Sequence, residues 1–235
     1  MIKSVSLFLI AACVVSKRMG LSEVARSSMR NLPKGFLSFT VWSNLDATAD
    51  APIMYFDVFF LSLLSSEAVG VFKLFKQLLS SLTLLSSPVQ QAIMPQLAEL
   101  IAKGLYDQAY SVVVKIRKVV VKIVAPCAVA AIAAVPPLLA FFLDPVYGSY
   151  WVLFAAMASL STFGISFSAL HPCFSAYGLS RQSAIITFFS NFIYLVACYL
   201  LIGEIGVMAI PMAMAMQYFL VIVPKIVYIK KYVLV

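Results

Sequence analysis

The stretch VVVKIVAPCAVAAIAAVPPLLAFFL, residues Val119–Leu143, decides the fold class. After Lys122, its last 21 residues carry no charge. An α-helix rises about 1.5 Å per residue, so these residues would form a helix roughly as long as a bilayer's hydrocarbon core is thick, about 30 Å. The stretch therefore predicts a membrane-spanning helix.

Five further segments of the chain share this length and apolar character. They are Phe36–Leu63, Val71–Pro95, Ser149–Tyr177, Gln182–Ile202 and Ile205–Ile229. Short connections join most of them, so neighbouring helices should run antiparallel. The sequence thus predicts an all-α integral membrane protein, with a six-helix transmembrane bundle over residues 35–235.

The composition supports a membrane protein. Hydrophobic residues make up 63% and charged residues 11% of the 235 residues, and the mean hydropathy is +1.01. A typical soluble domain is roughly 45–50% apolar and about 25% charged. The net charge of +8 is spread over short basic loops, which argues against a nucleic-acid-binding patch.

The N-terminal region carries a shorter apolar run, Val5–Val15, of 11 residues. It is too short to span a bilayer and similar in length to a signal-peptide core, but the basic residues after it argue against export. We interpret residues 1–16 as a partial or truncated transmembrane helix, or a short interfacial helix. Residues 17–34 are then a basic cytoplasmic linker.

The basic residues predict the orientation of the helices. Fourteen of the 17 Lys and Arg residues fall on one side of the predicted topology, and the turns on the other side carry Glu67, Asp144 and Glu204 without any Lys or Arg. Positive loops face the cytoplasm. We expect a multi-pass protein of the cytoplasmic (inner) membrane with its C-terminus inside. We also expect Gln96–Val114 to form an interfacial helical hairpin that turns near Gly104.

Three acids occur within the first predicted span, at Asp46, Asp50 and Asp57. At about 100° per residue they share one helix face. A charge near the bilayer centre costs about 2.5–3.5 kcal/mol, so this face should look into a bundle interior or a water-filled cavity. The functional interpretation is a proton, cation or polar-substrate site. The alternative is a set of interhelical hydrogen bonds or ion pairs with lysines.

The next predicted span carries a complementary polar stripe. It includes Lys73, Lys76 and Gln90, with Gln77 and Gln91 beside it. Either lysine could pair with Asp57, or both could extend to the membrane interface. If they line a cavity, they could attract an anionic group such as a lipid diphosphate.

Two later spans contain further candidates. His171 is the only histidine and precedes Pro172, which should kink the helix. It could act as a protonation switch, although a histidine hydrogen-bonded within a bundle is more common. Asn191 follows Ser183 and Thr187 at helical spacing, with the same two interpretations.

Enzyme chemistry has little support in the sequence. It contains no Walker loop, no GxGxxG, no HExxH and no Cys/His cluster with metal-ligand spacing. The four cysteines are far apart in apolar stretches, which suits small buried hydrophobes. We therefore expect no catalytic residues, no metal and no cofactor.

From about Leu32 onward, a series of local patterns appears in a defined order. They are FDVFFLSLLSSEAVGVFKLFKQLL, QQAIMPQLAELIAKGLYDQA, PPLLAFFLDPVYGSYWVLFAAMA and AYGLSRQSAIITFFSNFIYLVACYLLIGEIGVMAI. In their order and spacing they resemble the polysaccharide-biosynthesis flippases, the O-antigen-type lipid-linked oligosaccharide transporters of the multidrug/oligosaccharidyl-lipid/polysaccharide exporter superfamily. The resemblance covers the C-terminal half of such a transporter.

The resemblance implies half of a twelve-helix, inverted-V transporter with a central cavity. Its substrate would be an undecaprenyl-diphosphate-linked glycan, moved across the membrane by alternating access for surface polysaccharide or lipopolysaccharide synthesis. Its partners would be this lipid-linked oligosaccharide, membrane lipids and a missing N-terminal half or a second copy, with no nucleic acid. The alternatives are a cation-coupled multidrug exporter of the same superfamily, favoured by the acids, and a non-transporting membrane partner subunit.

Overall fold

The computed structural model of the protein describes residues 36–49, 51–84 and 86–233. These residues are almost entirely α-helical and include no β-strand, which confirms the all-α class. The predicted partial helix at 1–16 and the linker at 17–34 lie outside the described residues. The chain divides into two compact units, Met1–Val41 and Trp42–Val235, and the polar networks and cavities belong to the second.

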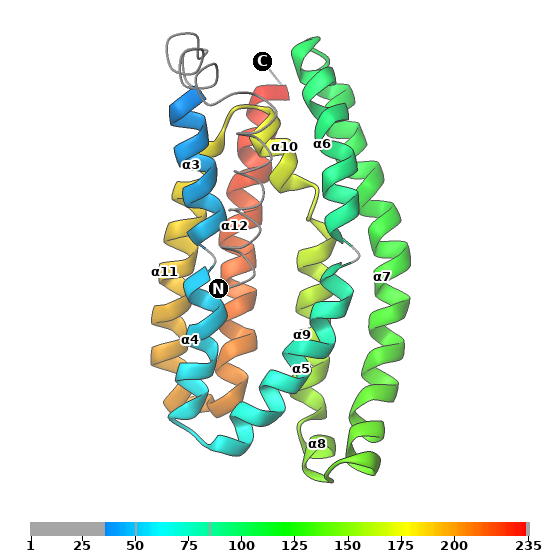
Figure 1. The fold of residues 1–235 in the computed structure, drawn as a ribbon, viewed down its shortest axis with the longest axis vertical. Coiled ribbons are helices and arrows are strands. Elements are labelled where there is room, and N and C mark those ends of the chain that lie inside the picture. Colours follow the sequence, from blue (N-terminus) through cyan, green and yellow to red (C-terminus); the bar gives the residue numbers. More distant parts are fainter. Residues whose placement is uncertain (1–35, 50, 85, 234–235) are drawn as a thin grey trace, which may run out of the picture. The chain divides into compact units, whose positions relative to one another are not determined.

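Ten α-helices are described, numbered α3 to α12, together with one 3₁₀ turn (Figure 1). They are α3 (Phe36–Ala49), α4 (Ala51–Ser62), α5 (Ser66–Leu84), α6 (Ser86–Ala102), α7 (Tyr106–Phe142), α8 (Val146–Ser149), α9 (Trp151–Ser166), α10 (Leu170–Ala176), α11 (Ser180–Ile205), the 3₁₀ turn η1 (Gly206–Met208) and α12 (Ala209–Val233).

Three of the described helical segments are long and apolar enough to cross a membrane: Tyr106–Phe142, Trp151–Ala176 and Ser180–Lys231. A fourth would be the pair Ser66–Leu84 and Pro88–Ala102, which bends by 40°. The last of the three segments reverses at Gly206, whose φ of +59° suits glycine, so that α11 and α12 pack along each other. By length and composition these three or four segments suggest a membrane protein, whereas the six-helix bundle stays a prediction.

The helix that begins at Tyr106 differs from its prediction. The expected turn near Gly104 is confirmed, and Gly104 adopts a φ of +72°. However, α7 is one continuous helix of 37 residues, so residues 106–114 continue directly into the predicted span and do not form a separate short helix. Ala109, Val113, Val120 and Val124 are buried at steps of four and seven, which is one face of a helix.

The predicted span Ser149–Tyr177 is broken into shorter helices. After α9 ends at Ser166, a turn over residues 167–169 leads into α10. Pro172 explains this break, because its ring clashes with the carbonyl four residues earlier, that of Ser168, and it lacks an N–H to donate. The kink expected from Pro172 is therefore present as an interruption of the helix.

Apolar side chains form two main clusters in the interior. In the first, Phe75 of α5 packs edge-on against Phe154 of α9 with ring centroids 4.9 Å apart, close to Tyr194 of α11. The second includes Leu97 of α6, Phe174 of α10 and Ile229 of α12. The clusters hold in place the helices that carry the buried polar side chains.

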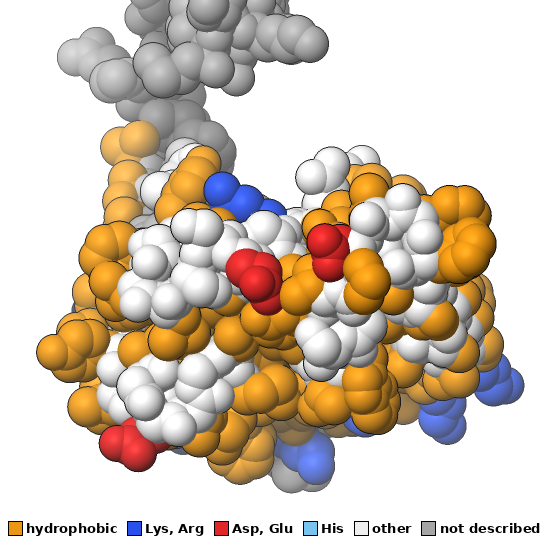
Figure 2. Space-filling model, turned by 90° about the horizontal axis from the view of Figure 1, so that it is seen from below, with side chains coloured by type: hydrophobic (Ala, Val, Ile, Leu, Met, Phe, Trp, Pro, Cys, Tyr) orange, Lys and Arg blue, Asp and Glu red, His pale blue; other side chains and the backbone are white. Residues whose placement is uncertain are grey.

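The two ends of the helices differ in charge. One end contains the turns before α5, before α8 and after α11, with Glu67, Asp144 and Glu204, and acidic side chains are visible there in Figure 2. The Tyr150 hydroxyl donates to Glu67 Oε1 at 3.3 Å, and burial together with this carboxylate raises the pKa of Tyr150. The opposite end carries Lys103, Arg181, Lys230 and Lys231. These described residues place the acidic turns and part of the predicted basic side at opposite ends of the helices.

Candidate functional site

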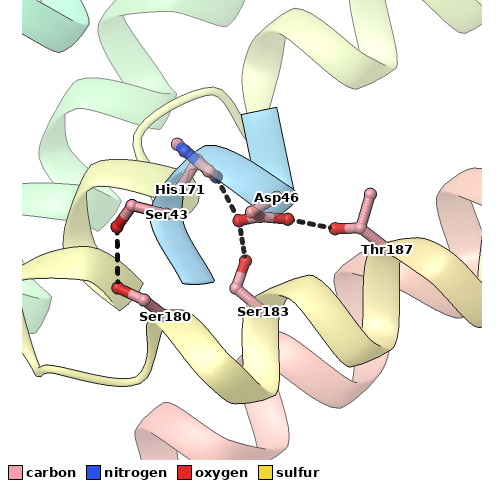
Figure 3. A network of polar contacts seen from close by, with 6 residues as sticks. All are labelled: Ser43, Asp46, His171, Ser180, Ser183 and Thr187. Carbon is pink, nitrogen blue, oxygen red and sulfur yellow. Dashed lines mark hydrogen bonds and ion pairs between the residues drawn. The ribbon is translucent and has the colours of Figure 1, made fainter. Parts of the chain in front are cut away.

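Asp46 is the centre of a polar network between α3 and α11 (Figure 3). Its side chain is buried, at 5% exposure. The Ser183 hydroxyl donates to Asp46 Oδ2 at 2.5 Å, and the Thr187 hydroxyl donates to Oδ1 at 2.7 Å. His171 of α10 approaches the same carboxylate, with Nδ1 at 3.5 Å from Oδ2. These donors stabilise a carboxylate that would otherwise be costly to bury.

The spacing of residues on α11 explains why one acid meets several donors. Ser180, Ser183, Thr187 and Asn191 follow one another at steps of three and four, which places them on one face. That face lies against α3, where the Ser43 and Ser180 hydroxyls are 3.2 Å apart and Asn191 Nδ2 donates to the Ala49 carbonyl at 2.8 Å. The polar seam continues to α12, since Gln217 Nε2 donates to Asn191 Oδ1 at 2.8 Å.

Asp57 forms a second polar centre, among α4, α5 and α11. It is 3% exposed, and Lys76 Nζ lies 2.6 Å from its Oδ2. The Tyr194 hydroxyl donates to Oδ1. Both carboxylate oxygens therefore have a partner, and the positive charge of Lys76 balances the negative charge of Asp57.

A cavity of about 530 Å³ lies beside Asp46. Its polar lining comes from α3, α5, α6, α9, α10, α11, α12 and the turn before α10: Asp46, Thr83, Gln90, Ser161, Ser168, His171, Thr187, Gln217, Tyr218 and Lys225. Lys225 is buried, at 5% exposure, and its ammonium lies 5.7 Å from the centre of the Phe174 ring. The buried hydroxyl of Ser168 has no hydrogen-bond partner among the described residues.

A second cavity, of about 470 Å³, lies beside Asp57 and Lys76. Thr83, Ser161, Gln217 and Tyr218 line both cavities, so the two adjoin at this level. Gly164 of α9 makes room for Tyr218, since a Cβ at this glycine would lie 3.0 Å from Tyr218 Cζ. The two acids thus face two adjoining cavities that share one polar wall.

The structure separates the candidate residues of the sequence by their surroundings. Asp46, Gln90 and His171 line the first cavity, and Asp57 and Lys76 line the second. Asn191 is buried in the seam between α3 and α11. Lys73, Gln77 and Gln91 are exposed and line neither cavity. Asp50 lies outside the described residues.

Among the polar residues that sequence reasoning missed are Tyr194, Gln217 and Lys225. Tyr194 follows Asn191 by three residues, and this spacing could have placed it on the same face. Gln217 is an isolated amide within the apolar run of α12, which also marks a buried position. Lys225 is one of the fourteen basic residues that the sequence places on the cytoplasmic side, but its side chain is buried next to Phe174.

The chemistry of this lining is that of ion pairing and hydrogen bonding. It combines two carboxylates, two ammonium groups and one imidazole, from Asp46, Asp57, Lys76, Lys225 and His171. Within the described ranges, no three His, Cys, Asp or Glu side chains are grouped so that they could hold a metal ion. The arrangement can hold a polar or charged ligand, or a proton, inside an apolar bundle.

Comparison with known proteins gives no relative. The chain matches no protein-family model, no curated protein and no solved structure.

Proposed function

We propose that this chain is half of a membrane transporter that moves a lipid-linked oligosaccharide across the cytoplasmic membrane by alternating access. The substrate is an undecaprenyl-diphosphate-linked glycan used in surface polysaccharide synthesis. The basic ends of the helices face the cytoplasm, and the other half of the transporter is a separate N-terminal half or a second copy of this chain.

The observation that carries this proposal is the pair of adjoining polar cavities in an otherwise apolar helical bundle. Charged side chains are expensive at membrane depth, and those that occur usually face a substrate or ion pathway. Asp46, His171 and Lys225 face the first cavity, and Asp57 and Lys76 face the second. A transporter needs such a lining, because its substrate gives up water during passage.

The interrupted helices support alternating access. The first cavity is lined by Phe167 and Ser168 from the turn between α9 and α10, and by Thr83 and Gln90 on either side of the bend between α5 and α6. Non-helical backbone within a membrane is tolerated where it lines a cavity or is covered by protein. Such breaks serve as hinges when helices move around a site.

The charges of the first cavity suit a diphosphate group. Lys225 is a buried cation there, and His171 can add a second positive charge when protonated. Asp46 lines the same cavity, where hydrogen bonds from the hydroxyls of Ser183 and Thr187 offset part of its negative charge. The burial of Asp46 and Asp57 also favours a second candidate function, a cation-coupled drug exporter that uses these acids to bind the coupling ion.

The decisive test is complementation of a flippase-deficient bacterial strain. The chain is expressed alone and with an N-terminal half, and surface polysaccharide is measured alongside membrane insertion. We expect polysaccharide to be restored with the N-terminal half, and to be lost in Lys225→Gln but not in Lys230→Gln, an exposed residue of the same helix. If the inserted protein restores nothing in either setting, the flippase proposal is wrong.

Drug accumulation in the same strains separates the two candidates. An exporter would lower accumulation in a proton- or sodium-dependent manner and would lose this activity in Asp46→Asn and Asp57→Asn. If the chain neither restores polysaccharide nor lowers drug accumulation, the remaining interpretation is a non-transporting partner subunit.

A further inference from the structure

An apolar groove of about 330 Å³ runs between α3 and α11, apart from the two polar cavities. It is lined by Trp42, Leu45, Thr48 and Ala49 of α3 and by Ala184, Ile185, Phe188 and Phe189 of α11. Several of the side chains that line it are exposed: Leu45 is 50% exposed, and Phe188 and Phe189 are 64% and 60% exposed. Part of this surface is therefore not covered by the described residues.

A cation lies at one end of this groove. The guanidinium of Arg181 is stacked over the Trp42 ring, with Cζ 5.5 Å from the ring centre. Arg181 is exposed, and among the residues that the structure describes no carboxylate pairs with it. It lies in the first turn of α11, at the end of the helices that also carries Lys103, Lys230 and Lys231.

The distance from Arg181 to the far end of the groove is comparable to the thickness of one leaflet of a bilayer. Phe189 follows Arg181 by eight positions on α11, which corresponds to about 12 Å along the helix axis. Half of the hydrocarbon core measures about 15 Å. The groove thus begins at an interfacial arginine and tryptophan and extends to near the middle of the bilayer, where an acyl chain would end.

We propose that this groove binds one anionic phospholipid, with its phosphate on Arg181 and an acyl chain along Trp42, Leu45 and Phe188. Charge complementarity favours this occupant, because the guanidinium of Arg181 stacks on Trp42 but has no anionic partner among the described residues, and a phosphate would supply one. Arginine is well suited to a phosphate, since its planar group donates several hydrogen bonds at once. The proposal does not depend on the transport function.

The two tryptophans of the chain allow a direct test. Trp42 lines the groove, whereas Trp151 begins α9 near the opposite, acidic end of the helices. In the full chain carrying Trp151→Phe, all tryptophan fluorescence therefore comes from Trp42 and reports on the groove alone. It is reconstituted in phosphatidylcholine vesicles that contain a minor fraction of brominated phosphatidylglycerol, or the same fraction of brominated phosphatidylcholine, and quenching of Trp42 fluorescence is measured.

From the quenching of Trp42, we expect the groove to prefer brominated phosphatidylglycerol about fivefold over brominated phosphatidylcholine. This is the effect of one basic residue near an anionic membrane surface. Arg181→Gln should remove the preference, Arg181→Lys should keep most of it, and the matched control Lys231→Gln should leave it unchanged. The Trp42→Phe protein, which reports from Trp151, should show no preference. Equal quenching by the two lipids, or a preference that survives Arg181→Gln, would overturn the proposal.

Filling the groove tests the position of the acyl chain. Thr48 lies on its wall and is exposed, so Thr48→Phe should reduce quenching of Trp42 by brominated phosphatidylglycerol while leaving Arg181 in place. Unchanged quenching would show that the chain lies elsewhere. Absence of quenching in the unmodified groove would show that protein covers it, from residues before 36 or from another chain, and this would also refute the lipid site.

Discussion

Lys76 Nζ lies 2.6 Å from Asp57 Oδ2, although the two residues are 19 positions apart and belong to different helices. The same lysine also lies 5.7 Å from the centre of the Phe72 ring. The pair links α4 to α5 on the wall of the second cavity. Lys73, one turn earlier on α5, is exposed and provides a matched control.

Lys76→Met should lower the free energy of unfolding by about 1–3 kcal/mol, because it leaves the Asp57 charge buried without its counter-ion. The effect is smaller than for a fully buried pair, since the Lys76 side chain is 35% exposed. Lys73→Met should have little effect. Unfolding in detergent, followed by circular dichroism, measures both. Equal effects of the two substitutions would contradict the importance of the pair.

The two hydroxyls that bind Asp46 should each contribute measurably to stability. Ser183→Ala and Thr187→Val should each cost about 1.5–3 kcal/mol, the range for hydrogen bonds to a charged group. Thr162→Val is the control, because the Thr162 hydroxyl donates to the carbonyl of Ala158 in its own helix. In an Asp46→Asn background the cost of Thr187→Val should shrink, and a cost that stays the same would mean that this bond is not made.

Gly164→Ala should displace Tyr218, because the new methyl group would lie 3.0 Å from Tyr218 Cζ. We expect a loss of about 1–3 kcal/mol from overpacking. Gly70→Ala in α5 is the control: apart from neighbouring atoms of its own helix, no described atom lies within 4 Å of its added methyl group, so it should stabilise the helix by about 0.5–1 kcal/mol. If Gly164→Ala behaves like Gly70→Ala, the close approach of Tyr218 is absent in solution.

Alkaline pH should destabilise the end of the helices near Tyr177. Burial, followed by the nearby Cys173, Tyr106 and Asp107, raises the pKa of Tyr177 from 10.0 to about 12. The folded protein then holds the proton more tightly than the unfolded chain. The contribution to stability is complete below about pH 10 and is lost as the pH rises through about 12.

The ultraviolet difference spectrum between the wild type and Tyr177→Phe measures this ionisation directly. The difference between the two spectra is the tyrosinate signal of Tyr177. If this signal appears with a midpoint near pH 10, the raised pKa is refuted. The hydroxyl of Tyr177 lies 3.4 Å from the Tyr106 carbonyl oxygen, so Tyr106→Phe, which keeps that carbonyl, should alter the midpoint only slightly.

The sequence by itself determined the helical class, the apolar character of the helices and the separation of charge between their ends. These features depend on local composition and on the cost of placing charges in hydrocarbon. The sequence also predicted that Asp46 and Asp57 are kept away from lipid, because three acids on one face of an apolar segment cannot all face hydrocarbon. Both side chains are buried, in agreement with this expectation.

Only the tertiary structure decided which groups the acids meet. Helical periodicity places Lys73 and Lys76 on neighbouring parts of one face, but the packing of Phe72 and Phe75 rotates α5 so that Lys76 faces Asp57 and Lys73 is exposed. Ser183 and Thr187 reach Asp46 from 137 and 141 positions away. Such contacts depend on how distant apolar faces pack together, and a pattern within one helix does not contain that information.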